Sequence, residues 1–554
     1  MGRPNAIAFV TLGLAACHAS VGGGEQQPVT GGAGSSTGEV VASETSTGAG
    51  TPSRDGPNTT TSTSTDGGES LATGESSDSA GSEPVVAGTI EFEVVLTAAE
   101  LPHCVSPGAF GPGSAWADVD GNGVLDFFAA GGNCPSTLML GQLDGTFVAG
   151  GQLGEAAGVT ATTGAVFADF DNDGWPDLYI LRNGPNMLLR NSGGNTFTDV
   201  TAVAGVGNIY NASSAAFGDY DNDGDLDLYV ANKLEHPDVL FRNDGDGTFV
   251  DVSSLVQPFT SYQTFGAAWL DFDNDADLDL YVVNDKEVGN QLWRNDGSGC
   301  DGWCFVDVAP LLGAWVPACG MGIAVGDVDN DGDLDLSYSD GYEHLLLGNH
   351  AAQGWLGFDD VSQAWALGFI GADWVGWGTA FLDADADAYL DLYVAGANVE
   401  NVLFRNTGAG YFKNASDRCG CDDPGYSYGV SVADYDLDGR PDLLVGNRNE
   451  GHTLYRNVTD LGDHRWVEVE LEGGGDINRD AVGSRVYLDL DDGSTVMAEV
   501  KAGSSVASGN STRLHFGLGL RSILAARIRW PNGLYETMPI PQEGTLWEHA
   551  YPGA

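Results

Sequence analysis

The stretch DYDNDGDLDLYVAN occupies residues 219–232 and places five aspartates within nine residues, directly before an alternating apolar run. Carboxylates a few Å apart repel one another by about 1 kcal/mol per pair even at the dielectric constant of water. A compact loop of this kind therefore requires a cation, and binding of that cation is coupled to folding. Six related stretches occur elsewhere in the chain: DVDGNGVLD from Asp118, DFDNDGWPD from Asp169, DFDNDADLD from Asp271, DVDNDGDLD from Asp327, DADADAYLD from Asp383 and DYDLDGRPD from Asp434.

Successive loops start 50 to 56 residues apart, a period typical of a four-stranded propeller blade. Each loop follows an apolar strand such as GAVFAD, and strands such as LDLYVAN, DVLFRN and GTFVDV come after it. Seven units of this kind predict an all-β, seven-bladed β-propeller over residues 89–460. The seventh unit lacks a fourth strand, while GTIEFEVVLT at residues 88–97 belongs to no blade. We therefore expect this segment to complete blade seven and close the ring.

Carboxylates recur at positions 1, 3, 5 and 9 of the loops, except that loop one has Asn122 at position 5, and Gly usually stands at position 6. Six or seven oxygens, with the backbone carbonyl of position 7 and water included, suit the flexible coordination of Ca²⁺. The sequence thus predicts up to seven Ca²⁺ ions. The predicted ligands are, at position 1, Asp118, Asp169, Asp219, Asp271, Asp327, Asp383 and Asp434; at position 3, Asp120, Asp171, Asp221, Asp273, Asp329, Asp385 and Asp436; at position 5, Asn122, Asp173, Asp223, Asp275, Asp331, Asp387 and Asp438; at position 7, Val124, Trp175, Asp225, Asp277, Asp333, Tyr389 and Arg440; and at position 9, Asp126, Asp177, Asp227, Asp279, Asp335, Asp391 and Asp442.

Three alternatives to calcium loops fit less well. Magnesium keeps more of its waters and uses fewer protein ligands. An EF-hand requires a Glu at position 12 and a following helix, whereas Val230 stands there within an alternating strand. Simple turn formation predicts scattered acids and no fixed register. Within the set, we expect weaker or later filling of loops four and six, because Ala276 and Ala388 replace the Gly at position 6.

The N-terminus has the features of an export signal, with Arg3 followed by an apolar run from Ala6 to Ala16. The run ends in Leu-Ala-Ala-Cys17, which resembles a bacterial lipobox, so Cys17 is the predicted lipidation site within a signal spanning residues 1–17. A plain secretory signal is the alternative. Residues 18–88 are rich in Gly, Ser and Thr and predict a disordered tether with a span of roughly 45 Å. We expect an exported, outer-membrane or cell-surface lipoprotein, or otherwise a secreted protein.

The formal net charge of −57 disfavours nucleic acid and anionic membranes as partners. We expect a monomer that contacts the membrane only through its N-terminal lipid. Among the cysteines outside the signal, Cys104 with Cys134 and Cys300 with Cys304 are plausible disulfides, and a structural role is favoured over redox chemistry for the CxC at 419–421.

No catalytic constellation stands out in the sequence. GYSYG at 425–429 fits G-x-S-x-G, but Ser427 precedes a blade strand and not a helix. The histidines form no HExxH motif, so zinc chemistry has no support. We favour a calcium-rigidified binding or adhesion scaffold for a protein or glycan, with partners on the loop-bearing faces. The aromatic side chains expected there are Trp374, Trp377, Tyr426 and Tyr428. The alternative is a surface-attached hydrolase or lyase built on a propeller.

The repeats resemble the FG-GAP/VCBS type found in integrin α-subunits and bacterial surface proteins, over about residues 100–457. Alternating runs such as WVEVELEG and RVYLDL indicate a further small all-β domain over residues 461–554. This part resembles the ASPIC/UnbV domain of the cartilage acidic protein family, through the segments at 478–483 (NRDAVG), 515–519 (HFGLG) and 530–533 (WPNG). The resemblance implies an architecture more than a mechanism. His515 within this domain is expected to be structural and not catalytic.

Overall fold

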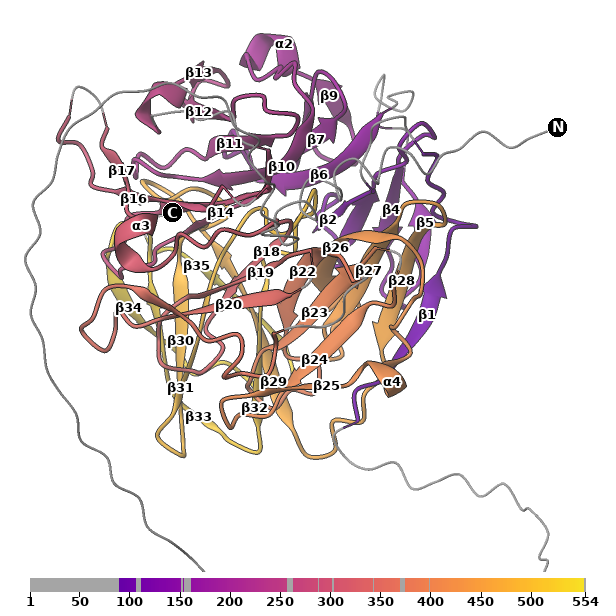
Figure 1. Ribbon diagram of the computed structural model, residues 1–554, viewed down its shortest axis with the longest axis vertical. Coiled ribbons are helices and arrows are strands. Elements are labelled where there is room, and N and C mark those ends of the chain that lie inside the picture. The colour runs from indigo at the N-terminus through magenta and orange to yellow at the C-terminus, as the bar shows by residue number, and fades with distance from the viewer. Residues whose placement is uncertain are drawn as a thin grey trace, which may run out of the picture. The chain divides into compact units, whose positions relative to one another are not determined.

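Each aspartate-rich loop joins the first two strands of a four-stranded antiparallel sheet in the computed structural model of the protein (Figure 1). The structure describes residues 89–105, 111–150, 153, 161–256, 263–286, 288–300, 303–341, 343–368, 374–397 and 399–552. The predicted signal, Cys17 and the tether at 18–88 lie outside these residues.

Seven such sheets form the blades of a β-propeller, and position 9 of every loop is the first residue of the second strand. The first six blades are, in order, β2 (Ser114–Ala117), β3 (Asp126–Ala129), β4 (Thr137–Gly141) and β5 (Phe147–Ala149); β6 (Thr162–Ala168), β7 (Asp177–Arg182), β8 (Met187–Asn191) and β9 (Phe197–Asp199); β10 (Ala212–Gly218), β11 (Asp227–Asn232), β12 (Val239–Asn243) and β13 (Phe249–Asp251); β14 (Thr264–Leu270), β15 (Asp279–Asn284), β16 (Gln291–Asn295) and β17 (Phe305–Asp307); β18 (Ile323–Gly326), β19 (Asp335–Ser339), β20 (His344–Asn349) and β21 (Phe358–Asp360); and β22 (Gly376–Leu382), β23 (Asp391–Gly396), β24 (Val402–Asn406) and β25 (Phe412–Asn414).

The seventh blade is completed by the N-terminal strand, as the sequence predicts. It contains β26 (Ser427–Ala433), β27 (Asp442–Asn447) and β28 (Gly451–Asn457), and β1 (Phe92–Leu96) pairs antiparallel with β28. Phe92 lies opposite Asn457 in this pairing. The β28 edge of the blade is thereby paired, which protects this strand from pairing with other chains.

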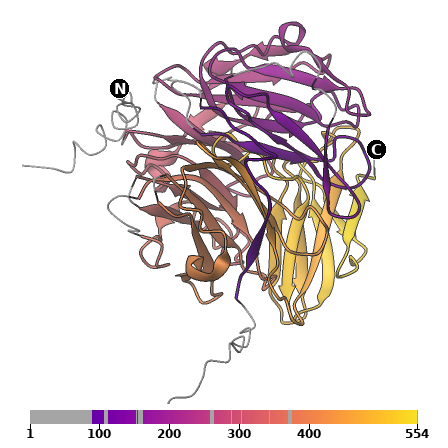
Figure 2. The same ribbon diagram turned by 90° about the vertical axis from the view of Figure 1, so that its right-hand side faces the viewer.

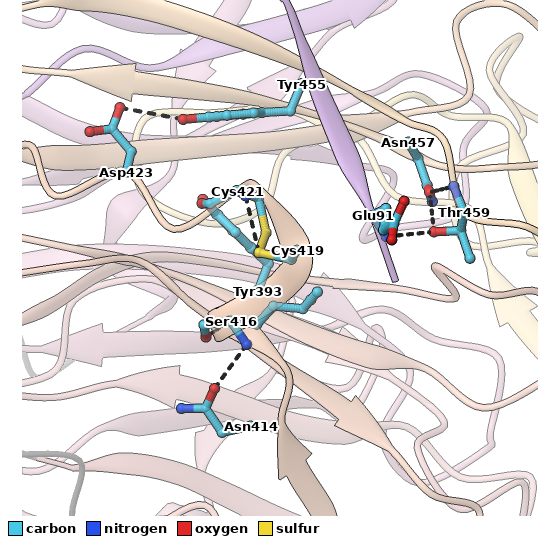
Figure 3. Close-up of a disulfide and its surroundings, with 11 residues drawn as sticks. Glu91, Tyr393, Asn414, Ser416, Cys419, Cys421, Asp423, Tyr455, Asn457 and Thr459 are labelled. Carbon is cyan, nitrogen blue, oxygen red and sulfur yellow. Dashed lines mark hydrogen bonds between the residues drawn. A yellow bond between two sulfur atoms is a disulfide. The ribbon is translucent and has the colours of Figure 1, made fainter. Parts of the chain in front are cut away.

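Disulfides fasten the region of closure. A Cys104–Cys134 bond ties the segment after β1 to blade one, and a Cys419–Cys421 bond lies in the core cluster that contains Phe92 (Figure 3). The hydroxyl of Tyr393 donates to the Cys421 carbonyl at 2.7 Å. The expected Cys300–Cys304 bond is present as well. Because Cys419 and Cys421 are both at most 1% exposed, the CxC motif serves packing at the closing strand.

Helices are few and short among the described residues: α2 (Thr201–Ala204), α3 (Ala309–Leu312), α4 (Ser416–Cys419) and the 3₁₀ turn η3 (Ser253–Leu255). Each follows the fourth strand of a blade. None of the helices in the described part of the chain is long and apolar enough to cross a membrane.

The C-terminal residues form two further sheets, which Figure 2 shows in yellow beside the blades. One sheet has the order β32-β29-β35 and the other the order β31-β30-β33-β34. Their strands are β29 (Arg465–Glu472), β30 (Arg485–Leu490), β31 (Thr495–Glu499), β32 (Leu514–Gly519), β33 (Ile523–Arg529), β34 (Tyr535–Met538) and β35 (Leu546–Ala550). The small all-β domain expected from the alternating pattern is therefore present.

A segment of the C-terminal domain, residues 502–511, reaches the innermost strands of the propeller, and we call it the plug. Its backbone and polar side chains hydrogen-bond to six of the seven blades, through Ser114 and Trp116, Ala165, Ser214 and Phe217, Ile323, Thr379 and Val432. An added Cβ on Gly113 or Gly164 would lie 2.0 or 1.9 Å from the Ala507 carbonyl oxygen. Glycine at these two positions is thus what allows the plug to approach the inner strands so closely.

Candidate metal centres

The conformation of each loop is set by its own carboxylates, which accept backbone N–H groups. In the loop of blade three, Asp219 at position 1 accepts from the amides of Asp223 (3.1 Å) and Gly224 (3.0 Å). Asp227 at position 9 accepts from Tyr220 at 3.1 Å and from Asn243, at the end of the third strand, at 2.8 Å. The same pattern recurs around the ring, so the register of acids in the sequence specifies both the turn and the direction of its oxygens.

The first, third and ninth residues of a loop converge on one point. Ligand oxygens of such a triad lie within 4.8 Å of one another, and the described residues contain seven groups of His, Cys, Asp or Glu that are this close. Five of them are the triads of loops one to five, for instance Asp219, Asp221 and Asp227. The sequence-predicted ligands at positions 1, 3 and 9 are thus brought together in these loops.

The position 3 carboxylates contain the atoms that most need a cation. Their Oδ1 is buried without a hydrogen-bond partner in six loops, at Asp120, Asp171, Asp221, Asp273, Asp385 and Asp436. A buried oxygen without a partner forfeits its hydration and gains nothing in return. This unpartnered atom recurs at the same position, so the triad is suited to a positively charged ion at its centre.

The pKa values of the triad carboxylates also indicate that the triads are suited to bind a cation. Burial, followed by the charges of Asp223 and Asp221, raises the pKa of Asp219 to about 8. In blade two, burial outweighs the amide bond from Asn191 and raises the pKa of Asp177 to about 9, with neighbouring carboxylates adding to it. Carboxylates held in a site that disfavours their charge are stabilised by a divalent cation. Acidic oxygen ligands without sulfur or imidazole fit a hard metal ion.

Positions 5 and 7 are arranged differently from the triad. The position 5 carboxylate accepts the amide of position 7, as Asp223 does from Asp225 at 3.1 Å. In blade one Asn122 plays this part with its amide oxygen, at 2.7 Å from the nitrogen of Val124. These residues frame the triad from the second half of the loop. Their role as ligands, including that of the position 7 carbonyl, stays a prediction.

Two backbone positions of the loop are left-handed. Position 6 has positive φ as expected, including 79° at Ala276 and 76° at Ala388. Position 4 is left-handed too, which the sequence reasoning missed, and it holds Ala386 (51°) and Leu437 (55°) in loops six and seven. The run of Asn at this position in loops two to five was the available signal, since Asn tolerates this conformation. Loop six therefore carries the strain twice.

A second element missed from the sequence is the Asn that ends the third strand. Six blades have it, and its side chain donates to the carbonyl of position 2 in the preceding blade's loop. Asn243 donates to Phe170 at 2.8 Å, and Asn295 donates to Tyr220 at 2.7 Å. The residues are Asn191, Asn243, Asn295, Asn349, Asn406 and Asn457. Each links its own position 9 carboxylate to the neighbouring loop, so the metal loops are connected from blade to blade.

Arginines beside these asparagines neutralise part of the loop charge. In blade two, Arg190 lies 2.5 Å from Asp171 and 2.9 Å from Asp173. Arg405 and Arg456 make the equivalent pairs in blades six and seven, whereas blades three and four direct theirs to Asp244 and Asp296. These ion pairs are exposed or half-exposed and therefore weak. One arginine per loop also carries a single positive charge against the three carboxylates of a triad, so it compensates only part of the loop's negative charge.

The loop end of the ring is in contact with the C-terminal domain, which corrects the expectation that it is open to partners. The Asp480 carboxylate accepts the Asp169 amide of loop two at 2.8 Å, and Arg513 donates to the Gly123 carbonyl of loop one at 3.1 Å. In loop four, Arg529 lies 2.5 Å from the Asp271 carboxylate. All of these side chains are at most partly exposed. The sequence held no signal for this docking.

The four aromatic residues expected on a partner surface are not there. Trp374, Trp377 and Tyr428 are at most 5% exposed, and Tyr426 packs partly buried against the core. The ring centroids of Trp377 and Tyr428 lie 4.4 Å apart, at the end of the inner strands far from the metal loops. Trp377 and Tyr428 belong to one core cluster of the protein and Trp374 to another, so these side chains serve packing.

Two further residues behave as the sequence suggests. Ser427 opens strand β26, is buried, and donates to the Asn447 side chain at 2.6 Å, so GYSYG is no nucleophile elbow. His515 is bonded through Nε2 to the Gly439 carbonyl of loop seven at 3.0 Å, and burial lowers its pKa to about 4. It is a structural contact between domain and propeller.

Fold and site together define a seven-bladed β-propeller with one acidic loop per blade and a small β domain at the C-terminus. The model of the FG-GAP-like repeat matches residues 118–180, 169–230, 227–282, 271–337 and 358–445, and that of ASPIC and UnbV matches residues 474–549. The chain belongs to the FG-GAP-like repeat family and carries an ASPIC and UnbV domain.

Curated relatives match a short part of the chain. Cartilage acidic protein 1 of Homo sapiens is 36% identical over 80 residues, which are 14% of this chain and 12% of the human protein. The protein of the same name from Xenopus tropicalis is 32% identical over 83 residues, 15% of this chain and 13% of its own length. The match thus spans about an eighth of these relatives.

Solved structures are similar to part of the chain at low identity. The N-terminal part of BBS1 in complex with ARL6 is 9% identical, with 68% of this chain and 99% of that chain covered and a TM-score of 0.41. A lectin of Agrocybe aegerita, described as recognising non-reducing terminal N-acetylglucosamine, is 17% identical, with 61% and 86% covered and a TM-score of 0.38.

Proposed function

We propose that the protein is a calcium-binding propeller scaffold that acts outside the cell as a binding or adhesion module for a protein or glycan. The observation that carries the calcium part is the repeated triad with its orphaned, buried position 3 oxygen. Bound Ca²⁺ would supply positive charge to the triad carboxylates at positions 1, 3 and 9, and thereby rigidify the loops. Seven ions would leave the folded protein acidic, since the formal net charge is −57.

The extracellular setting is part of the same proposal. FG-GAP-like repeats are typical of surface proteins, the three disulfides among the described residues suit an oxidising compartment, and the lipobox-like Cys17 would provide the anchor. Fatty-acid labelling distinguishes a lipid-anchored form from a secreted form. We expect the expressed chain to be labelled by a radioactive or clickable fatty acid, and we expect a Cys17→Ser variant to lose this label.

The binding role calls for a surface, and the loop end is in contact with the chain's own domain. Exposed aromatic side chains lie instead at the rim of blades four and five, where Trp315 and Trp355 are 44% and 51% exposed. These blades are neighbours there, because Gly313 abuts the Phe358 backbone. Exposed tryptophans are enriched among the residues that dominate binding energies. This rim is our candidate contact surface for a protein or glycan.

The test is adhesion of beads coated with the protein to glycan arrays and to cells, in calcium and in chelator. We expect binding in calcium, loss of it in chelator, and at least a fivefold reduction in a Trp355→Ala variant, with an exposed Leu143→Ala variant unchanged. Turnover of a polysaccharide or an ester by the purified protein would contradict the proposal and favour the hydrolase or lyase.

A further inference from the structure

The C-terminal domain contacts the metal loops mainly through their backbone. Arg521 donates to the Asp387 carbonyl at 2.6 Å, and the amide of Gly519 donates to Ala386 at 2.8 Å, both in loop six. His464, just before the domain's first strand, is bonded to the Asp385 carbonyl of the same loop at 2.8 Å. Three successive carbonyls of one loop are therefore bound from outside the propeller. Such contacts depend on the loop's conformation, because a carbonyl moves whenever its turn opens.

Loop four is contacted by two buried arginines. Arg485 is fully buried, donates to the Asp271 carbonyl and the Asn274 side chain, and pairs with Glu499 at 2.8 Å. Arg529 is 3% exposed and lies 2.5 Å from the Asp271 carboxylate. A buried ion pair is stable only while both partners stay together, because removal of one partner leaves the charge of the other buried and uncompensated. The loop conformation and the docked position of the domain thus depend on each other.

Because of the plug, docking of the C-terminal domain involves most of the blades of the ring. It is buried along residues 502–509 and bonded to the inner strands of six blades, whereas the loop contacts of the same domain lie on blades one, two, four, six and seven. Undocking would expose the plug and uncover the inner strands in one step. The inner amides of Ala165 and Phe217, which donate to plug carbonyls, would then lose their partners.

We propose that the C-terminal domain is a cap whose docking is thermodynamically linked to the metal loading of the loops. The inference rests on the proposed calcium binding. Triads without a metal hold three mutually repelling carboxylates, so their loops open more readily and withdraw the carbonyls that the cap binds. Metal loading favours the closed loop and so favours docking. Linkage is reciprocal, so the docked cap in turn raises the affinity of the loops for calcium.

The experiment is hydrogen–deuterium exchange of the full chain in calcium and in excess chelator, with calcium binding to the same samples measured by calorimetry. We expect peptides covering the plug to exchange at least tenfold faster in chelator. If calcium binds while the plug exchanges equally slowly in both conditions, the inference is overturned and the calcium proposal stands. If no calcium binds, the proposed function fails and the inference fails with it.

A pair of variants tests the reciprocal arm. Arg521→Ala removes the charged donor to loop six, whereas Arg527→Ala removes an arginine that pairs with Asp489 and lies over the Tyr487 ring, both inside the cap. Loss of a hydrogen bond from a charged group corresponds to about a tenfold change in equilibrium constant. We expect Arg521→Ala to weaken one calcium site by about that factor and to speed exchange of the plug in calcium, and Arg527→Ala to do neither. Equal behaviour of the two variants, both shown by circular dichroism to be folded, would contradict the linkage.

Discussion

The link between neighbouring blades makes a sharp prediction at Asn243. Its Nδ2 donates to Phe170 of blade two at 2.8 Å and to Leu226 at 3.2 Å, and its Oδ1 accepts the Gly245 amide at 3.1 Å. The residue is 1% exposed, so Asn243→Ala leaves buried carbonyls without a partner. Three hydrogen bonds at a net of about 0.5 to 1.5 kcal/mol each give an expected loss of about 1.5 to 4.5 kcal/mol in the free energy of unfolding.

The assay is urea unfolding in calcium, followed by tryptophan fluorescence, with Thr248→Ala as the control. Thr248 lies in the same blade, and its side chain bonds only to the exposed Asp246. We expect the control to change stability by less than 0.5 kcal/mol, which is usual for surface positions. If Asn243→Ala unfolds at the same urea concentration as Thr248→Ala, the blade-to-blade link contributes nothing to stability and the reasoning is refuted.

Three further predictions concern strain, pH and closure. Ala388→Gly should raise the free energy of unfolding in calcium by about 0.5 to 1 kcal/mol, because relief of the strain at φ 76° exceeds the entropic cost of Gly; no gain in urea unfolding would count against it. Burial lowers the pKa of His452 to about 4 while the unfolded value is near 6.5, so the contribution of this histidine to stability should be constant above pH 6.5 and fall by up to about 1.4 kcal/mol per pH unit down to pH 4, in addition to that of His515. His452→Gln should flatten that slope in melts at pH 5 and 7, and an unchanged slope would show another group to be responsible. Deletion of residues 89–97 should abolish cooperative thermal unfolding, since β28 loses its partner β1, whereas a cooperative melt like that of the full chain would contradict ring closure.

The architecture was predictable because its determinants are local and repeated. The alternation of apolar and polar residues, the turn residues and the fixed register of acids specify each blade on its own. Seven copies of a blade-sized unit then predict a seven-bladed propeller. Even closure could be inferred, since β1 was a strand without a blade and blade seven a sheet without an edge strand. The triads follow from the same register, because position 9 begins a strand and position 1 directly follows one.

What the sequence did not reveal depends on contacts between distant residues. Trp374 and Trp377 sit near loops in the chain, yet the convergence of the inner strands buries them. The plug is a Gly-, Ser- and Ala-rich stretch that reads as a surface loop, and only its fit against Gly113 and Gly164 shows why its residues are small. The asparagine link was visible as the recurring RN at the end of the third strand. Its partner, a carbonyl 73 residues away for Asn243, was not.

The most direct test of the calcium account is a count of bound metal combined with thermal melting. Calorimetric titration and elemental analysis of the full chain should give about seven Ca²⁺ per molecule, and excess chelator should lower the melting temperature markedly, because binding to the folded state alone stabilises it. Fewer than three bound ions, or a melting temperature that chelator leaves unchanged, would contradict the account.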